Sequence, residues 1–348
     1  MTETPLTLES LWCSLLVRRI RWAPSNSFLG AQLLRKAEAL ELPAMRSRLG
    51  KHCRRAVCPE VHWQEPCGGC AVVRTCSWPR LFPGSALGLS GVAPLAGWVL
   101  ARDGGGFLST HFGLDPETFM VVGRALDDAF ADSLGLDRRG PADHPRWLTP
   151  YLMDGDGRSP LLPLPWGVSV PMSPPPSPLA EGSAIRFRTP LDLKTANDIR
   201  PPAMAEWLRL GRNRLHRLAA QNGFGIWPRE DPRWAALNQS AEASLWSWSE
   251  PSHGTPWRPL AKYQISLRGW TGLARIEHLP EAWAPWAALL PAIGVGSHIP
   301  YGCGLGTIEL MASPPQERMQ GCGPATEPQI HRIIPLAWRA DLAREAGG

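Results

Sequence analysis

The sequence predicts an α+β fold, and three observations lead to this prediction. Hydrophobic residues make up 44% of the 348 positions and charged residues 19%, which is typical of a globular chain long enough for two domains. Residues 171–182, PMSPPPSPLAEG, divide the chain near its middle, because proline favours an extended connection. Beyond this point, segments with the period of strands alternate with segments with the period of helices.

The elements predicted in the second half follow a regular order. Apolar and basic residues alternate in AIRFR, as in a strand, and Leu208, Leu215 and Leu218 share one side of a helix. We expect a strand at 184–193, a helix at 203–221, strands at 257–267 and 271–279 that turn at Gly269, a helix at 281–293 and a strand at 304–311. This is the order of the ferredoxin-like unit, which RNA-recognition domains also use.

The first half has a weaker pattern. The predicted elements are a strand at 11–20, helices at 29–40 and 45–57, a strand at 92–101 and a strand running into a helix at 118–134. They are compatible with a second ferredoxin-like (RRM-like) unit. We therefore expect two tandem domains at residues 1–170 and 184–312, joined by a linker at 171–183 and followed by a tail at 313–348.

The charged residues permit nucleic-acid binding without requiring it. The formal net charge is +5 and the pI about 8.9. Four of the 36 basic residues are lysines, so 32 are arginines, which bind phosphates through two parallel hydrogen bonds. A GC-rich genome would give the same excess of arginine over lysine, so both explanations stay open.

The chain has neither a membrane-length apolar run nor a signal-peptide pattern, and we expect a cytoplasmic protein.

A glycine-rich segment, GVGSHIPYGCGLG at residues 294–306, follows the last predicted helix; we call it the glycine loop. Glycines let the backbone approach a ligand closely and expose amide groups that suit phosphates. The segment lacks GK[ST] and follows a helix, so it is neither a Walker loop nor a dinucleotide fingerprint. A tight helix-to-strand connection without a ligand is an equally consistent interpretation.

Several segments, in this order along the chain, resemble a known family. They are LGKHCRRAVC at 49–58, CGGCAVVRTCSWPRLF at 67–82, FRTPLDLK at 187–194, RGWTGLARIEHL at 268–279, EAWAPWAALLPAIG at 281–294 and GVGSHIPYGCGLGTIEL at 294–310. Together they are similar to the pre-crRNA-processing endoribonucleases of the RAMP superfamily, the Cas-six family of CRISPR systems. The Trp-rich stretch at 227–257 and the tail beyond residue 312 depart from the family pattern.

The resemblance implies two tandem ferredoxin-like domains that bind the hairpin of a CRISPR repeat and cleave at its base. It also implies a mature crRNA that stays bound in most members and is kept in, or passed to, an effector complex with other Cas proteins. The RNA-binding residues that we expect are Arg54, Arg55, Arg186, Arg188, Arg209, Arg212, His216, Gly294, Gly296, Ser297, Gly302, Gly304 and Gly306.

Cleavage of RNA without a metal ion needs a base for the 2′-hydroxyl, an acid for the 5′-oxygen and cations for the phosphorane, and it leaves a cyclic phosphate. Histidine suits both proton transfers near neutral pH. We expect His52, on the LGKHCRR helix, to be the first candidate, with Lys51 beside it. His298 and Tyr301 in the glycine loop are further candidates.

Four cysteines lie close together, with the spacing C-x8-C-x2-C-x5-C. They are Cys58, Cys67, Cys70 and Cys76. Four thiolates can complete a tetrahedral sulfur site, so we expect a structural zinc ion without a catalytic role. An iron–sulfur cluster and four reduced cysteines without a metal are the alternatives.

Two other functions stay open for the whole chain. One is a catalytically silent RAMP subunit that only holds crRNA within an effector complex. The other is a metal-dependent enzyme at the cysteine cluster, which would need an open coordination position.

Overall fold

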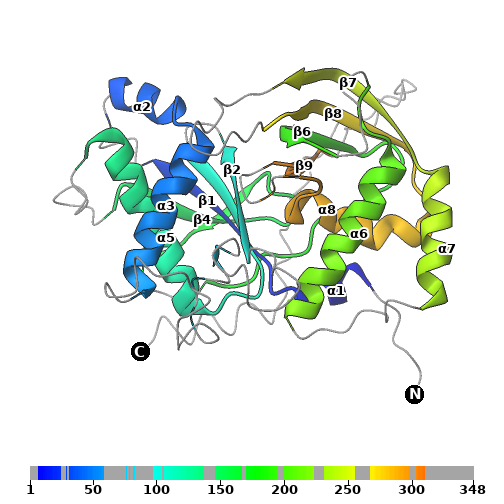
Figure 1. The fold of residues 1–348 in the computed structure, drawn as a ribbon, viewed down its shortest axis with the longest axis horizontal. Coiled ribbons are helices and arrows are strands. Elements are labelled where there is room, and N and C mark those ends of the chain that lie inside the picture. Colours follow the sequence, from blue (N-terminus) through cyan, green and yellow to red (C-terminus); the bar gives the residue numbers. More distant parts are fainter. Residues whose placement is uncertain are drawn as a thin grey trace, which may run out of the picture. The chain divides into compact units, whose positions relative to one another are not determined.

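Two antiparallel sheets form the framework of the protein, as a computed structural model shows (Figure 1). The structure describes residues 7–24, 29, 31–58, 76, 78, 81–82, 97–103, 106–136, 146–166, 170–193, 200–222, 231–254, 267–297, 299 and 303–309. Both sheets belong to one unit, Met1–Met311. The predicted tail lies outside the described residues.

The first sheet has five strands in the order β2-β3-β1-β4-β5. Helices α2 and α3 lie between β1 and β2 in sequence, and α5 lies between β3 and β4, so the first four strands have ferredoxin-like topology. The bounds are β1 (Arg18–Pro24), α2 (Ala31–Glu38), α3 (Leu42–Val57), β2 (Trp98–Asp103), β3 (Gly106–His111), α5 (Pro116–Leu134), β4 (Leu148–Met153) and β5 (Pro160–Pro163).

The second sheet has four strands in the order β7-β8-β6-β9, which again is the ferredoxin-like order. Its elements are β6 (Ala184–Leu191), α6 (Met204–Gln221), α7 (Pro232–Ser240), η4 (Ala241–Ala243), β7 (Leu245–Gly254), β8 (Gly269–His278), η5 (Glu281–Trp283), α8 (Ala284–Ile293) and β9 (Gly306–Glu309). The predicted α+β fold with two tandem ferredoxin-like units is confirmed.

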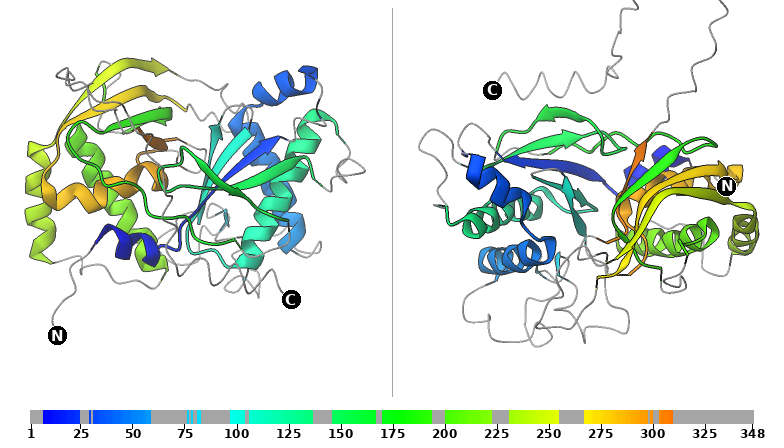
Figure 2. Two further views of the ribbon diagram at one scale, coloured as in Figure 1. Left: turned by 180° about the vertical axis from the view of Figure 1, so that it is seen from behind. Right: turned by 90° about the horizontal axis from the view of Figure 1, so that it is seen from above.

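Helices cover one face of each sheet. In the first sheet, Ile20 and Trp22 of β1 are buried in one cluster with Leu49 of α3 and Phe130 of α5. Figure 2 shows α3 in blue and α5 in teal together on one side of β1. In the second sheet, Phe187 of β6 is buried in a cluster with residues of α6 and α8. The opposite face of each sheet is not covered by these helices.

The predicted strand at residues 11–20 is wrong, because a helix precedes β1. Helix α1 (Leu8–Ser14) begins at a capping box, in which the Thr7 hydroxyl accepts a hydrogen bond from Ser10 N at 3.1 Å. Leu11 and Trp12 are buried on the inner side of this helix. The run of apolar residues therefore reflects one helix face followed by β1.

The partner strand of β8 also differs from the prediction. Most of the predicted strand at 257–267 lies outside the described residues, and β8 pairs with β7, inside the Trp-rich stretch. Trp246 and Trp248 alternate with serines, and their rings lie 5.9 and 5.5 Å from that of Phe187. The tryptophans therefore form the inner face of a strand.

The predicted strand at the start of residues 118–134 is a helix from its first turn. Asp115 is the N-cap of α5, and its carboxylate accepts a hydrogen bond from Thr118 N at 2.7 Å. The apolar residues Phe119, Val122 and Leu126 are buried at helical spacing.

The proline-rich segment between the sheets contains no helix or strand, but it is fixed to the first half of the chain. Ser173 is 2% exposed. Its hydroxyl accepts a hydrogen bond from Arg19 N at 2.8 Å, and its carbonyl accepts one from Trp12 Nε1 at 2.7 Å. The domain boundaries that we placed around this segment stay a prediction.

In the described part of the chain, no helix is long and apolar enough to cross a membrane.

Asp127 links α5 to β4 and makes the stability of the fold depend on pH. Its buried carboxylate accepts hydrogen bonds from Trp147 N at 2.9 Å and Leu148 N at 2.7 Å. Burial raises the pKa of Asp127 to about 6, despite these hydrogen bonds. The unfolded chain loses this proton near its ordinary pKa of 3.8, whereas the folded protein keeps it until about pH 6. The free energy of unfolding therefore falls as the pH rises from 4 to 7.

We predict that Asp127→Asn removes this dependence, because the amide oxygen can still accept both hydrogen bonds. Relative to the wild type, the free energy of unfolding of the variant should rise by up to about 3 kcal/mol between pH 4 and pH 7. Urea unfolding at several pH values measures it. Asp128→Asn, at the next and partly exposed position, is the control. An equal change in both variants would contradict the assignment to Asp127.

Candidate functional site

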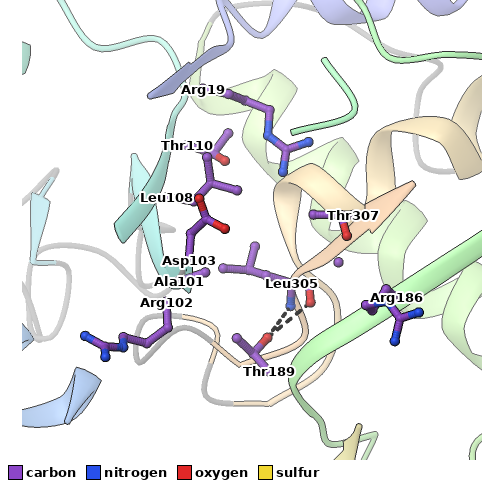
Figure 3. A pocket seen from close by; sticks show the side chains of 11 residues that line it. Arg19, Ala101, Arg102, Asp103, Leu108, Thr110, Arg186, Thr189, Leu305 and Thr307 are labelled. Carbon is purple, nitrogen blue, oxygen red and sulfur yellow. Dashed lines mark hydrogen bonds between the residues drawn. The ribbon is translucent and has the colours of Figure 1, made fainter. Parts of the chain in front are cut away.

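The sheet faces that carry no helices border one pocket, which we call the cleft (Figure 3). Arg19 and Thr110 are paired in register on β1 and β3, and their neighbours Ile20 and Ser109 point to the helix side. The cleft is lined by Arg19, Ala101, Arg102, Asp103, Leu108 and Thr110 of the first sheet and by Arg186, Thr189, Leu305, Gly306 and Thr307 of the second. Both ferredoxin-like units therefore contribute to a single site.

Three arginines in the cleft are held by oxygen atoms of the protein. Arg19 is 2% exposed and donates from Nη1 to Gly155 O at 2.6 Å. Arg102 lines the cleft only through the base of its side chain: Nη1 donates to Ala37 O of α2 at 2.9 Å, and Figure 3 shows the guanidinium pointing away from the other lining residues. Arg186 pairs with Glu309. Burial lowers the pKa of Arg19 to about 10, so its guanidinium remains charged at neutral pH. Arg19 and Arg186 thus place two positive groups at the cleft, and the carboxylates of Asp103 and Glu309 lie at the same site.

Hydroxyl groups line the part of the cleft next to the glycine loop. Thr189 Oγ1 donates to Leu305 O at 3.1 Å and accepts from Leu305 N at 3.0 Å, which ties β6 to the residue before β9. Thr307 Oγ1 is buried and has no hydrogen-bond partner within the described ranges. A hydroxyl in this position can donate to, or accept from, a bound polar ligand.

The glycine loop is bonded to the end of β6 by its own backbone. Val295 N donates to Gly304 O at 3.0 Å, Gly304 N to Pro190 O at 2.8 Å, and Ser297 N to Asp192 O at 2.7 Å. These three amides are therefore engaged within the protein and are not free for a phosphate. His298, Tyr301 and Gly302 lie outside the described residues, so their predicted functions stay predictions.

Close packing explains two of the glycines. Gly304 has a φ of 70°, and a Cβ atom there would lie 1.9 Å from Val295 O. Gly296 has a φ of 104°, and a Cβ atom there would lie 2.3 Å from Asp192 O. In the described part of the loop, glycine is required because the backbone packs on itself and on β6. The RNA contacts expected at Gly294, Gly296, Ser297, Gly304 and Gly306 stay predictions.

His52 lies on the other side of the first sheet from the cleft. Its side chain is 5% exposed, and Nε2 is 2.7 Å from Asp132 Oδ2 on α5. Helix α3 packs through Leu49 and Cys53 into the cluster that contains Ile20. His52 therefore has a structural contact between two helices, and a direct contact with RNA would require it to move.

The other cations of α3 divide into exposed and packed groups. Lys51 and Arg55 are exposed. The guanidinium of Arg54 lies 5.9 Å from the centre of the Trp78 ring. Lys51 and Arg55 are therefore on the surface, whereas Arg54 is also packed against an aromatic side chain.

Helix α7, which the sequence did not predict, packs on the basic face of α6. Arg212 donates from Nη1 to Asn238 Oδ1 at 2.6 Å, and its guanidinium lies 5.1 Å from the Trp234 ring. Arg209 pairs with Glu242. The ring of His216 lies 5.8 Å from that of Trp234. The predicted RNA contacts of this helix face would have to compete with α7. The side chain of Arg188 lies outside the described residues.

The cysteine cluster is described only in part. Cys67 and Cys70 lie outside the described residues, and Cys58 and Cys76 are partly buried and not joined in a disulfide. Within the described ranges, no group of three or more His, Cys, Asp or Glu residues could hold a metal ion. The zinc site therefore stays a prediction, without support from the described residues.

Sequence reasoning missed most of the residues that line the cleft. Of these, only Arg186 and Gly306 were expected as RNA-binding residues. The alternating basic residues of RRIRW, at 18–22, were a usable signal for Arg19, because alternation places them on one face of a strand. The pairing of Arg19 with Thr110 depends on strand register, which the sequence did not give.

Solved structures that are similar to the chain include two Cas6 product complexes. One is a Thermus thermophilus Cas6 protein in a product complex, with 16% identity and a TM-score of 0.44, matched over 85% of this chain and 100% of that one. The chain is similar to Cas6 proteins over most of its length. A second Cas6 product complex has 17% identity and a TM-score of 0.37, and is matched over 84% of this chain and 99% of that one.

No protein-family model matches the chain, and no curated protein does. Cas6 is the family that the sequence motifs resemble. The functions of individual residues in this chain rest on its own geometry.

We predict that Gly304→Ala destabilises the protein far more than Gly135→Ala. Both glycines have a φ close to 70°, but a Cβ atom at Gly135 would have no atom within 4 Å. The change at Gly135 should cost roughly 1 kcal/mol of unfolding free energy, from backbone conformation alone. The change at Gly304 should cost roughly 3 kcal/mol or more, because the loop must also move away from Val295 O. Urea unfolding compares them, and equal costs would show that the loop adapts freely.

Proposed function

We propose that the chain binds the repeat of pre-crRNA and cleaves it without a metal ion, giving mature crRNA with a 2′,3′-cyclic phosphate. The observation that carries the proposal is the cleft. Two ferredoxin-like sheets contribute arginines and threonines to it, and the glycine loop returns to it through Leu305 and Gly306. Such sheets are a common platform for single-stranded RNA.

The reaction requires the RNA to supply its own nucleophile. The 2′-oxygen forms a bond to phosphorus, the bond to the 5′-oxygen breaks, and the 2′-proton passes to a base. An acid gives a proton to the leaving 5′-oxygen. Fixed cations stabilise the charge that gathers on the phosphorane oxygens. Arg19 and Arg186 of the cleft and the exposed Lys51 and Arg55 of α3 are the cations that we propose for RNA binding.

His298 is the histidine that we propose for proton transfer. It belongs to the glycine loop, whose neighbouring Ser297 is bonded to the end of β6. Tyr301 is a second group in the same loop that can donate a proton. His52 is the weaker candidate, because Asp132 holds its Nε2 atom and the side chain is buried.

We predict that the wild type cleaves its repeat hairpin in excess EDTA and leaves a cyclic phosphate. His298→Ala should lower the single-turnover rate constant by roughly 100-fold or more, because a proton carrier is lost. His52→Ala should mainly lower stability, because the contact between His52 and Asp132, which joins α3 to α5, is lost. His278→Ala is the control, since this exposed histidine pairs with Glu181.

Three outcomes would change the proposal. Tight binding without cleavage would leave a silent subunit. Cleavage that EDTA abolishes would require a metal ion. Loss of cleavage in a stable His52→Ala protein would move the proton transfer to His52.

We predict that Arg186→Gln weakens binding of the repeat RNA by a factor on the order of 10 and lowers the slope of log Kd against log salt concentration by about one. The reason is the loss of one phosphate contact in the cleft. Arg233→Gln is the matched control, because Arg233 also pairs with a carboxylate, Asp231, but lies at α7. Equal effects of both changes would indicate a general charge effect and not a site at Arg186.

The alternative function is a catalytically silent RAMP subunit that holds crRNA in an effector complex with other Cas proteins. The observation that favours it is the His52–Asp132 pair, which gives the first catalytic candidate a structural partner. Both functions place the protein in the cytoplasm, where crRNA is made. Under either, the cysteine cluster would hold a structural zinc ion and take no part in cleavage.

A further inference from the structure

A buried arginine lies beneath the start of the glycine loop. Arg214 of α6 is 8% exposed, and its Nε donates to Ile293 O at 2.8 Å. Ile293 is the last residue of α8, and the loop begins at the next position, Gly294. The last carbonyl groups of a helix have no partner within it, so a side-chain donor there fixes the helix end.

A glycine on the same face of α6 allows this contact. Gly211 lies one turn before Arg214, and a Cβ atom there would lie 2.4 Å from Leu290 Cδ1 of α8. The absence of a side chain at Gly211 lets the two helices approach closely. The guanidinium can then reach the end of α8.

The charge of Arg214 has no carboxylate partner within the described residues. Its Nη2 atom is buried without a hydrogen bond there. Burial and, to a lesser extent, the nearby charge of Arg217 lower the pKa of Arg214 to about 9, so the side chain stays protonated at neutral pH. An unpaired buried charge disfavours folding, so packing alone does not explain an arginine at this position.

We propose that Arg214 is a positioning residue: it fixes the end of α8, sets where the glycine loop enters the cleft, and adds positive charge beneath the loop. The loop is then held at two places, at α8 by Arg214 and at β6 by Pro190 and Asp192. This inference rests on the proposed function, because it assigns the loop a part in placing the scissile phosphate.

The first test needs no RNA. Hydrogen exchange is measured on the full chain for wild type, Arg214→Met, Arg214→Lys and the control Arg217→Met, which changes an exposed arginine of the same helix. In Arg214→Met, exchange at the Val295 and Ser297 amides should rise by about 10-fold or more, while the paired strands β6 and β8 stay protected. Arg214→Lys should restore part of the protection, because it keeps a cationic donor.

The second test separates positioning from binding. With saturating protein and repeat RNA, the single-turnover rate constant of Arg214→Met should fall by roughly 100-fold, as expected when a reacting group is misplaced by about 1 Å. Its Kd for the RNA should change far less, and Arg214→Lys should recover part of the rate.

Unchanged loop exchange in Arg214→Met, or exchange equal to that of Arg217→Met, would overturn the inference. So would a Kd that rises by the same factor as the rate falls. If Arg214→Met does not fold, the loop exchange of Arg214→Lys decides, and wild-type protection would overturn the inference. Absence of cleavage in the wild type would instead refute the proposed enzyme, and the exchange data would still test Arg214.

Discussion

The hydrogen bonds between the glycine loop and the end of β6 are the constraint on which the candidate site depends. Pro190 O and Asp192 O accept from Gly304 N and Ser297 N, and Thr189 exchanges two hydrogen bonds with Leu305. Together they bring the chain back from α8 in the register that places Gly306 opposite Phe187. These hydrogen bonds and the pairing of β9 with β6 position the second-sheet side of the cleft. The glycines are consequences of this close approach, because a side chain would occupy the space of a carbonyl oxygen.

The sequence predicted best those elements whose periodicity comes from one continuous apolar face. Helix α6 and strand β6 are examples, since each buries one side against its own unit. Prediction from the sequence failed where an element buries its apolar side against a distant part of the chain. Leu11 and Trp12 looked like a strand because their helix, α1, is short and buries its apolar side among residues of the second half. Trp246 and Trp248 looked like an insert because Phe187, which they contact, lies about 60 positions away in the sequence.

The basic residues show a related limit. Composition counts cations but does not show which of them the protein itself engages. Arg212 is held by Asn238 and Trp234, and Arg54 by the Trp78 ring. Arg19 and Arg186 line the cleft because strand pairing and sheet packing put them there, although Gly155 O and Glu309 also engage them. A motif can therefore identify a basic helix, but the tertiary contacts decide whether its charges are available to RNA.

The two ferredoxin-like units share part of their interior. Leu11, Val99 and Phe112 of the first half belong to the same buried cluster as Trp207 and Leu290 of the second. Separating the halves would expose this apolar surface to water, at a cost that neither half could recover alone. The chain should consequently unfold in a single cooperative transition, and neither unit is a module that could be exchanged with another protein.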